Sequence, residues 1–276
     1  MRVLVVDQDD MSTQLIRSKL EAIGHQVVEE PVKNNAVERL AGDDFDVVLF
    51  DPSPLTSPRP MILNARRSVK NYPYIVLISQ SISQEEALKS GSNDFLKKPI
   101  DSTLLLQKVD NAKRLIKLVR RVGDESEDFP SAGGVIAKSA FNQLFLSAMD
   151  RADRYGERTF ILQISLNNYK ELLEGSGSYA AEFAVAKLCQ YLVLLRRQSD
   201  IIGQTAKNEY SLLLQRPIYE TEPIEAANRF AQELAALKDI DSGRAEPAEI
   251  LVSLIDVPTG AQLVEHVFKP NETVES

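Results

Sequence analysis

The chain has 276 residues, of which 43% are hydrophobic, and this is enough for two ordinary domains that each bury a core. Its net charge is −8, and the acidic excess lies entirely after residue 125, which argues against a nucleic-acid-binding output. The single cysteine excludes an internal disulfide, no apolar run reaches the ~18 residues needed to cross a membrane, and no signal peptide opens the chain, so we expect a cytoplasmic protein.

Short apolar runs alternate with amphipathic segments over residues 1–122. The runs lie at residues 3–6, 27–28, 47–50, 75–78 and 95–96. They are β-branched and nearly continuous, which is typical of strands buried on both faces of a parallel sheet. A helix ended by Gly24 should follow the first run, and Asp101 should cap the last helix. Five strand–helix units predict an α/β domain with a flavodoxin-like, doubly wound sheet.

A polar segment rich in acid, glycine and proline, residues 123–134, predicts a linker to a second domain over 135–276. Helices are expected at about 138–155, 179–197 and 222–237, and strands at 159–166, 200–204, 208–215 and 250–254. Because two of these strands form a central hairpin, we expect an α/β domain with a mixed, mainly antiparallel sheet.

Reactive side chains follow four strands of the first domain. Asp7 follows the first strand, Asp51 the third, Ser79 the fourth and Lys98 the fifth, and these strand ends meet at one edge of the sheet. Any one such aspartate could simply cap a helix, but suitable residues at four strand ends require another explanation. The arrangement resembles the receiver domain of bacterial two-component systems.

This resemblance implies a role for each residue. Asp51 would be the phosphoacceptor, Asp7 and Asp51 would hold Mg²⁺, and Lys98 would neutralise phosphoryl charge. Ser79 would be the hydroxyl that follows the phosphoryl group, and Phe95 the aromatic switch residue. A histidine kinase or phosphotransfer protein would be the phosphoryl donor.

Several positions depart from the receiver pattern. Gln8 replaces a second acid that normally touches the metal, and the side chain of Asp9 should point elsewhere, so Mg²⁺ affinity should fall. Residues 52–55 lack the usual Met-Pro, and Gln80 replaces a small residue. The segment between the fourth and fifth strands is short, which predicts a truncated or remodelled fourth helix. We expect slow, weak or absent phosphorylation.

The second domain resembles the GGDEF domain of diguanylate cyclases over about residues 130–256. Residues 206–210, Ala-Lys-Asn-Glu-Tyr, fall at the hairpin motif, residues 165–170 fall at the Asp-x-Asp-x-Phe-Lys segment, and residues 134–141 match the family's opening. The family joins two GTP molecules with two metal ions held by acids.

The positions that this chemistry needs carry other residues here. Ser165 and Asn208 stand at the two metal acids, and Ala206 and Lys207 replace the glycines that admit phosphate. Leu173 replaces the asparagine that reads guanine, whereas Glu182 partly retains its acidic partner, and Glu209 is kept. We therefore expect a degenerate domain that is not an enzyme.

An Arg-x-x-Asp segment, Arg197 to Asp200, precedes the hairpin motif by five residues. This offset resembles the inhibitory site at which the family binds its product, cyclic di-GMP, and Arg229 lies where the family has a supporting arginine. Arginine suits a phosphate or a guanine edge, and aspartate accepts from guanine N–H groups. A surface Arg–Asp pair at a helix end explains the same residues without a ligand, and both interpretations stay open.

The leading interpretation is a response regulator without enzymatic activity. A receiver input would be coupled to a cyclic di-GMP-binding domain that acts on a downstream protein partner, with a homodimer as one possible assembly. The alternative is a protein-interaction adaptor that binds no nucleotide, and a third interpretation is an active cyclase with unusual metal ligands.

Overall fold

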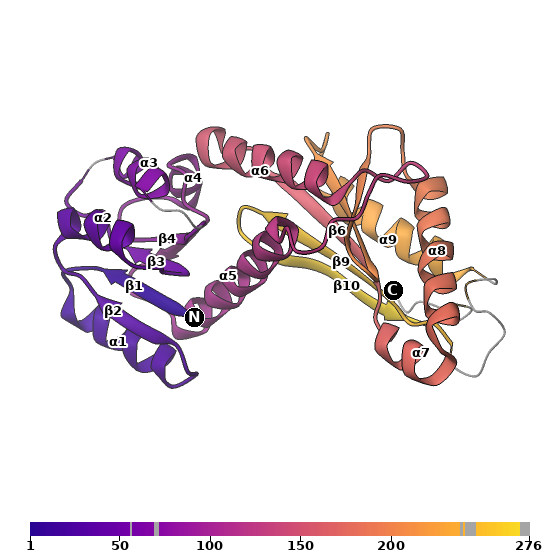
Figure 1. The fold of residues 1–276 in the computed structure, drawn as a ribbon. Helices are drawn as coiled ribbons and strands as arrows, with labels where there is room; N and C mark the ends of the chain where they lie inside the picture. Colours follow the sequence, from indigo (N-terminus) through magenta and orange to yellow (C-terminus); the bar gives the residue numbers. More distant parts are fainter. Residues whose placement is uncertain (56, 69–71, 238–239, 241–246, 271–276) are drawn as a thin grey trace. The chain divides into compact units, whose positions relative to one another are not determined.

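The computed structural model describes residues 1–55, 57–68, 72–237, 240 and 247–270 (Figure 1). The chain divides into two compact units, and each contains one five-stranded sheet. Unit 1 comprises Met1–Arg120, Met149–Glu157 and Val257–Ala261. Unit 2 comprises Arg121–Ala148, Arg158–Asp256 and Gln262–Ser276.

Unit 1 is built on a parallel sheet with the strand order β2-β1-β3-β4-β5. Its strands are β1 (Arg2–Val6), β2 (Gln26–Glu29), β3 (Val47–Phe50), β4 (Tyr74–Ser79) and β5 (Asp94–Lys97). Its helices are α1 (Asp10–Glu21), α2 (Lys33–Gly42), α3 (Arg59–Ser68), α4 (Gln84–Lys89) and α5 (Ser102–Gly123). Figure 1 shows α1 and α2 on opposite faces of the sheet, so the predicted doubly wound fold is confirmed.

Local sequence signals explain where several helices of unit 1 begin and end. The Asp9 side chain caps α1 by accepting from the Met11 amide, and Asp101 accepts from the amides of the first turn of α5. Gly24, with φ of +83°, lies in the turn after α1. Helix α4 has only six residues and begins at a capping box formed by Ser83 and Glu86. The predicted truncation of the fourth helix is confirmed.

Unit 2 has the strand order β10-β9-β6-β8-β7, and the pairs β10–β9, β6–β8 and β8–β7 are antiparallel. Its strands are β6 (Thr159–Leu166), β7 (Ile201–Ala206), β8 (Glu209–Gln215), β9 (Ile250–Val257) and β10 (Gln262–Phe268). The remaining helices are α6 (Lys138–Tyr155), α7 (Tyr169–Ser176), α8 (Ser178–Leu195) and α9 (Glu222–Ala235). The predicted mainly antiparallel sheet is confirmed, whereas α7 and β10 were not predicted.

Helix α8 is the one helix in the described part of the chain that is long and apolar enough, by length and composition, to cross a bilayer. This corrects the expectation that no segment reaches that length. Its buried residues include Ala181, Ala184, Leu188 and Leu192, which belong to the core of unit 2. Because a core helix passes the same test, the finding is weak evidence for a membrane span.

Candidate functional site

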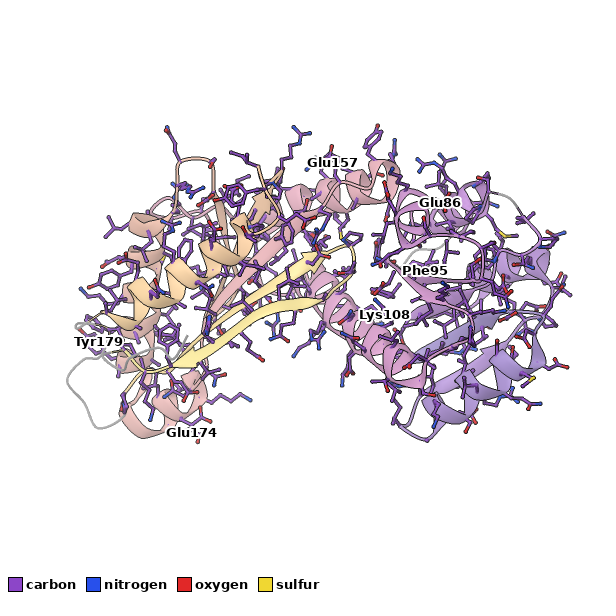
Figure 2. All side chains as sticks on the ribbon, turned by 180° about the vertical axis from the view of Figure 1, so that it is seen from behind. Glu86, Phe95, Lys108, Glu157, Glu174 and Tyr179 are labelled. Carbon is purple, nitrogen blue, oxygen red and sulfur yellow. The ribbon has the colours of Figure 1, made fainter. Side chains whose placement is uncertain are left out.

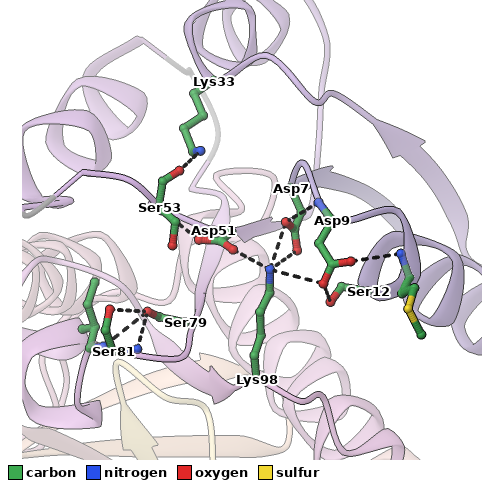
Figure 3. Close-up of polar contacts among 11 residues, drawn as sticks. Asp7, Asp9, Ser12, Lys33, Asp51, Ser53, Ser79, Ser81 and Lys98 are labelled. Atoms are coloured by element: carbon green, nitrogen blue, oxygen red, sulfur yellow. Dashed lines mark hydrogen bonds and ion pairs between the residues drawn. The ribbon is translucent and has the colours of Figure 1, made fainter.

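The carboxyl ends of β1, β3 and β5 bring two aspartates and a lysine of unit 1 into direct contact (Figure 3). The Lys98 ammonium group donates to Asp51 Oδ2 and, over 3.0 Å, to Asp7 Oδ1. All three residues are less than 10% exposed. The cation lies between two carboxylates, as the order of the strands predicts.

The electrostatics of the cluster favour the charged forms of Asp51 and Lys98. Burial alone would raise the pKa of Asp51, but hydrogen bonds from Lys98 and from the Ser53 amide, at 2.8 Å, outweigh it and hold that pKa below its ordinary value. Burial alone would lower the pKa of Lys98, but its bonds to Asp51 and Asp7 raise it. Asp51 is therefore a carboxylate at neutral pH, the form that can attack phosphorus.

Asp7 and Asp51 are the carboxylates that could hold Mg²⁺ here. Asp7 Oδ2 lies 2.8 Å from Lys98 Nζ, but it is buried and accepts no well-directed hydrogen bond, so it retains capacity for a cation. Asp9, 3.9 Å from Lys98, also accepts from Ser12 Oγ at 2.6 Å and caps α1, and Gln8 is exposed. Two carboxylates suit an ion that keeps most of its water ligands.

Ser79 and Phe95 lie beside this cluster in different ways. Ser79 is buried at the end of β4, and its hydroxyl accepts from the amides of Ser81 and Ile82 at 3.1 and 3.2 Å (Figure 3). Phe95, on β5, is half-buried and packs against the core of unit 1 (Figure 2). The hydroxyl is therefore engaged with its own loop, and the roles of both residues stay predictions.

A further cation approaches the cluster from α2. The Lys33 ammonium group donates to the carbonyl of Ser53, two residues after the expected phosphoacceptor (Figure 3). The sequence contains no motif for this contact, because it depends on how α2 lies against the loop after β3.

The cyclase-like segments of unit 2 converge as the resemblance implies. Ser165 on β6 is the antiparallel partner of Glu209 on β8, and Asn208 lies in the turn before it. The Asn208 amide donates to the Leu166 carbonyl at 2.8 Å, so this side chain is committed to the backbone of β6. In the described part of the chain, no group of three or more histidine, cysteine or acidic residues is placed to hold a metal ion.

Glu209, the retained acid, is held by donors from three directions. Thr205 Oγ1 donates to it at 2.8 Å, Gln163 Nε2 donates at 3.2 Å, and Arg121, at the end of α5, forms an ion pair with it. Glu209 itself is 8% exposed. Both carboxylate oxygens are therefore used within the protein. The contribution of Arg121 was missed by the sequence reasoning.

A cavity of about 530 Å³ lies beside the hairpin motif. Its walls include Val135, Tyr169, Glu182, Cys189 and Lys207. Glu182, which the resemblance to cyclases aligns with a guanine-binding aspartate, thus lines a cavity of ligand size, whose other walls are largely apolar.

The three predicted nucleotide-binding residues line a second cavity of unit 2, of about 380 Å³. Asp200 Oδ2 accepts from the backbone amide of Arg197 at 2.8 Å, whereas the Arg197 guanidinium group pairs with Glu222 at 3.0 Å. Asp200 therefore closes a turn, and the simple Arg–Asp side-chain pair that the alternative interpretation required is replaced by an Arg197–Glu222 pair.

Arg229 reaches the same cavity from α9. Its Nη1 donates to the Leu195 carbonyl at 3.1 Å, and its guanidinium carbon lies 5.0 Å from the Phe230 ring centroid. Its Nε and Nη2 are buried and have no hydrogen-bond partner among the residues that the structure describes. Unpaired buried donors are costly, so an acceptor that reached either nitrogen atom would be favoured there.

Comparison with known proteins finds one relative that matches nearly the whole chain and others that match part of it. No protein-family model matches. An uncharacterized 76.5 kDa protein of Thiocystis violacea is 23% identical over 267 residues, which cover 93% of this chain and 38% of that protein. The response regulator PleD of Caulobacter vibrioides is 30% identical over 150 residues, which cover 50% of this chain and 32% of PleD. The chain spans well under two thirds of both relatives.

Solved structures that resemble parts of the chain include domains of two kinds. The receiver domain of the Francisella response regulator 1452 is 28% identical, and the match covers 40% of this chain and 94% of that domain, with a TM-score of 0.36. The GGDEF domain of Pseudomonas aeruginosa PA1120 is 17% identical, and the match covers 44% of this chain and 70% of that domain, with a TM-score of 0.38. In unit 1, the structure brings Asp7, Asp51 and Lys98 into contact, as expected from their strand ends.

Proposed function

We propose that the chain is a two-component response regulator whose receiver domain is coupled to a degenerate GGDEF domain that binds cyclic di-GMP without making it. The observation that carries this proposal is the meeting of Arg197, Asp200 and Arg229 at one cavity. Arg197 and Asp200 lie in the turn between α8 and β7, whereas Arg229 comes from the middle of α9, so the meeting of the two arginines at one cavity depends on the fold.

The chemistry of this cavity matches a cyclic dinucleotide. The two arginines supply planar donors for phosphate oxygens or for the acceptor edge of guanine. Arg229 brings two unused donors, and a ligand that accepts from them would remove the cost of leaving them unpaired. The second oxygen of Asp200 would accept from guanine N–H groups.

The state of the hairpin motif supports the absence of catalysis. Two Mg²⁺ ions need several carboxylates, but Ser165 and Asn208 are neutral and Glu209 is bound to Arg121, Thr205 and Gln163. The input would enter at Asp51, with phosphoryl from a histidine kinase or phosphotransfer protein and with Mg²⁺ held by Asp7 and Asp51. Because Gln8 supplies no charge, we expect this phosphorylation to be slow or weak.

Titration of the full chain with cyclic di-GMP by isothermal calorimetry tests the proposal. We expect a binding isotherm that Arg197→Ala abolishes. Arg154→Ala is a matched control, because the Arg154 side chain is nearly as exposed, pairs with Asp150 on α6 and does not line the cavity. Absence of heat at high micromolar ligand would refute nucleotide binding and leave the adaptor function. Loss of binding in both variants would refute the assignment of the site.

A further inference from the structure

The Arg197 guanidinium group already has an acidic partner inside the proposed nucleotide cavity. Glu222 Oε1 lies 3.0 Å from Arg197 Nη1, and Glu222 lines the same cavity as Arg197, Asp200 and Arg229. Among these four side chains the formal charges cancel, since two are cationic and two are anionic. Arg216 lines the cavity too, so the formal charge of the whole lining is only +1, and a ligand with two phosphate charges would meet little net positive charge.

The position of Glu222 is fixed by the backbone and not only by Arg197. It is the first residue of α9, and its Oε2 accepts from the Ile218 amide at 2.6 Å. Its side chain is 19% exposed, compared with 59% for Arg197. The carboxylate thus belongs to the less exposed partner of the pair, and it lies at the helix N-terminus, which also favours its charge.

We propose that Glu222 is an internal competitor that sets the affinity of this cavity for dianionic ligands. The inference rests on the proposed cyclic di-GMP site and adds a residue that the Arg-x-x-Asp pattern does not contain. A phosphate oxygen and the Glu222 carboxylate seek the same guanidinium donors. Ligand binding therefore requires that Arg197 exchange an anion that the protein provides for one that the ligand provides.

A substitution at Glu222 can separate the effect of its negative charge from the effect of its shape. Glu222→Gln removes the negative charge but keeps a carbonyl oxygen that can accept from the Ile218 amide. Glu225→Gln is the matched control, because Glu225 lies one turn later on α9 and accepts at 2.8 Å from both Tyr219 Oη and Thr221 Oγ1 instead of Arg197. Both variants lose one acid from the same helix, so a general effect of net charge would appear in both.

Calorimetric titration of the full-length wild type and variants with cyclic di-GMP tests the inference. We expect Glu222→Gln to lower Kd by about two- to fivefold, the range for an ion pair with an exposed partner, and Glu225→Gln to change it less than twofold. Glu222→Ala, which also loses the Ile218 bond, should tighten binding as well. Melting temperatures within a few degrees of the wild type verify that each variant folds.

The outcomes separate this inference from the proposed function. If the wild type binds and neither Glu222 variant binds more tightly, the competitor role is overturned while the site stands. If Glu225→Gln strengthens binding as much as Glu222→Gln, the effect is one of net charge and the role is again overturned. If neither the wild type nor Glu222→Gln binds, the proposed function fails and the inference fails with it.

Discussion

Replacing Lys98 by methionine would leave two carboxylates facing each other without their shared cation. Lys98, Asp7 and Asp51 are less than 10% exposed, and the ammonium group contacts both acids. Breaking a buried ion pair by removing one partner costs about 3–5 kcal/mol. We expect the lower end, about 3 kcal/mol at pH 7.5, because the neighbouring Gln8 and Asp9 are exposed and water is close.

The same variant should become relatively more stable in acid. In the wild type the pKa of Asp51 is lowered, so its stabilising contribution is present above its ordinary pKa of about 4 and is lost only as the pH falls through the lower folded value. Stability from this group is thus constant between pH 5 and 7.5. Without Lys98, burial would raise the pKa of Asp51, and protonation of this carboxylate would relieve the penalty as the pH falls. We expect the difference between the proteins to shrink to less than about 2 kcal/mol at pH 5.

Urea denaturation followed by circular dichroism measures this difference at both pH values. Lys97→Met is the matched control, since Lys97 is the preceding residue and is exposed, and it should change stability by less than about 0.5 kcal/mol. About 10 mM Mg²⁺ should restore about 1.4 kcal/mol to the Lys98 variant if Mg²⁺ binds the freed acids with Kd near 1 mM. A penalty that is the same at pH 5 and pH 7.5, or that is below 1 kcal/mol, would refute the electrostatic reasoning.

Three further predictions concern the two motifs. Gln8→Asp should tighten Mg²⁺ binding roughly tenfold, because a third carboxylate would face the ion, and an unchanged affinity in a fluorescence titration would contradict the metal position. If the protein takes a radiolabelled phosphoryl group from a small phosphodonor, the Asp51→Asn variant should not become labelled. Persistent labelling of this variant would show that another residue is the acceptor. Arg121→Ala should lower the free energy of unfolding by about 1–2 kcal/mol because Glu209 loses its cation, whereas Arg120→Ala, whose side chain is 70% exposed, should lower it by less than about 0.5 kcal/mol. Equal losses in urea denaturation would contradict the role of Glu209 as a buried acceptor.

Most elements could be predicted because their sequence pattern has one dominant physical cause. A strand such as Val47–Phe50 is buried on both faces, so it is apolar throughout and ends at its first polar residue. Strand β10 escaped prediction because Leu263 and Val267 on its more exposed side are as apolar as the buried Val264 and Phe268, which hides the alternation. Helix α7 escaped because it has eight residues and only Gly177 separates it from α8.

Some contacts of the candidate sites could be predicted from the sequence, and others could not. Asp7, Asp51 and Lys98 could be brought together from the sequence, since the ends of parallel strands meet at one edge whatever the details of packing. The acidic partners of Arg121 and Arg197 could not be predicted, because each follows another arginine in the chain, and only the rotation of a helix end decides which acid each arginine reaches. Sequence patterns fix which residues share an edge better than they fix which neighbour on a helix faces inward.

If the second domain is a degenerate cyclase, as proposed, the contacts of Asn208 and Glu209 in the sheet explain why one acid would be lost and the other kept. Position 208 lies in a turn, where an amide satisfies the Leu166 carbonyl and no buried donor requires a negative charge. Position 209 lies inside β8, where a neutral, non-accepting side chain would leave the Thr205 hydroxyl, the Gln163 amide and the Arg121 guanidinium group without their acceptor. A domain that ceased to hold metal ions would lose nothing by changing the first residue, but it would lose stability by changing the second. A retained acid in this hairpin is therefore evidence for the fold, and it does not by itself argue for turnover of GTP.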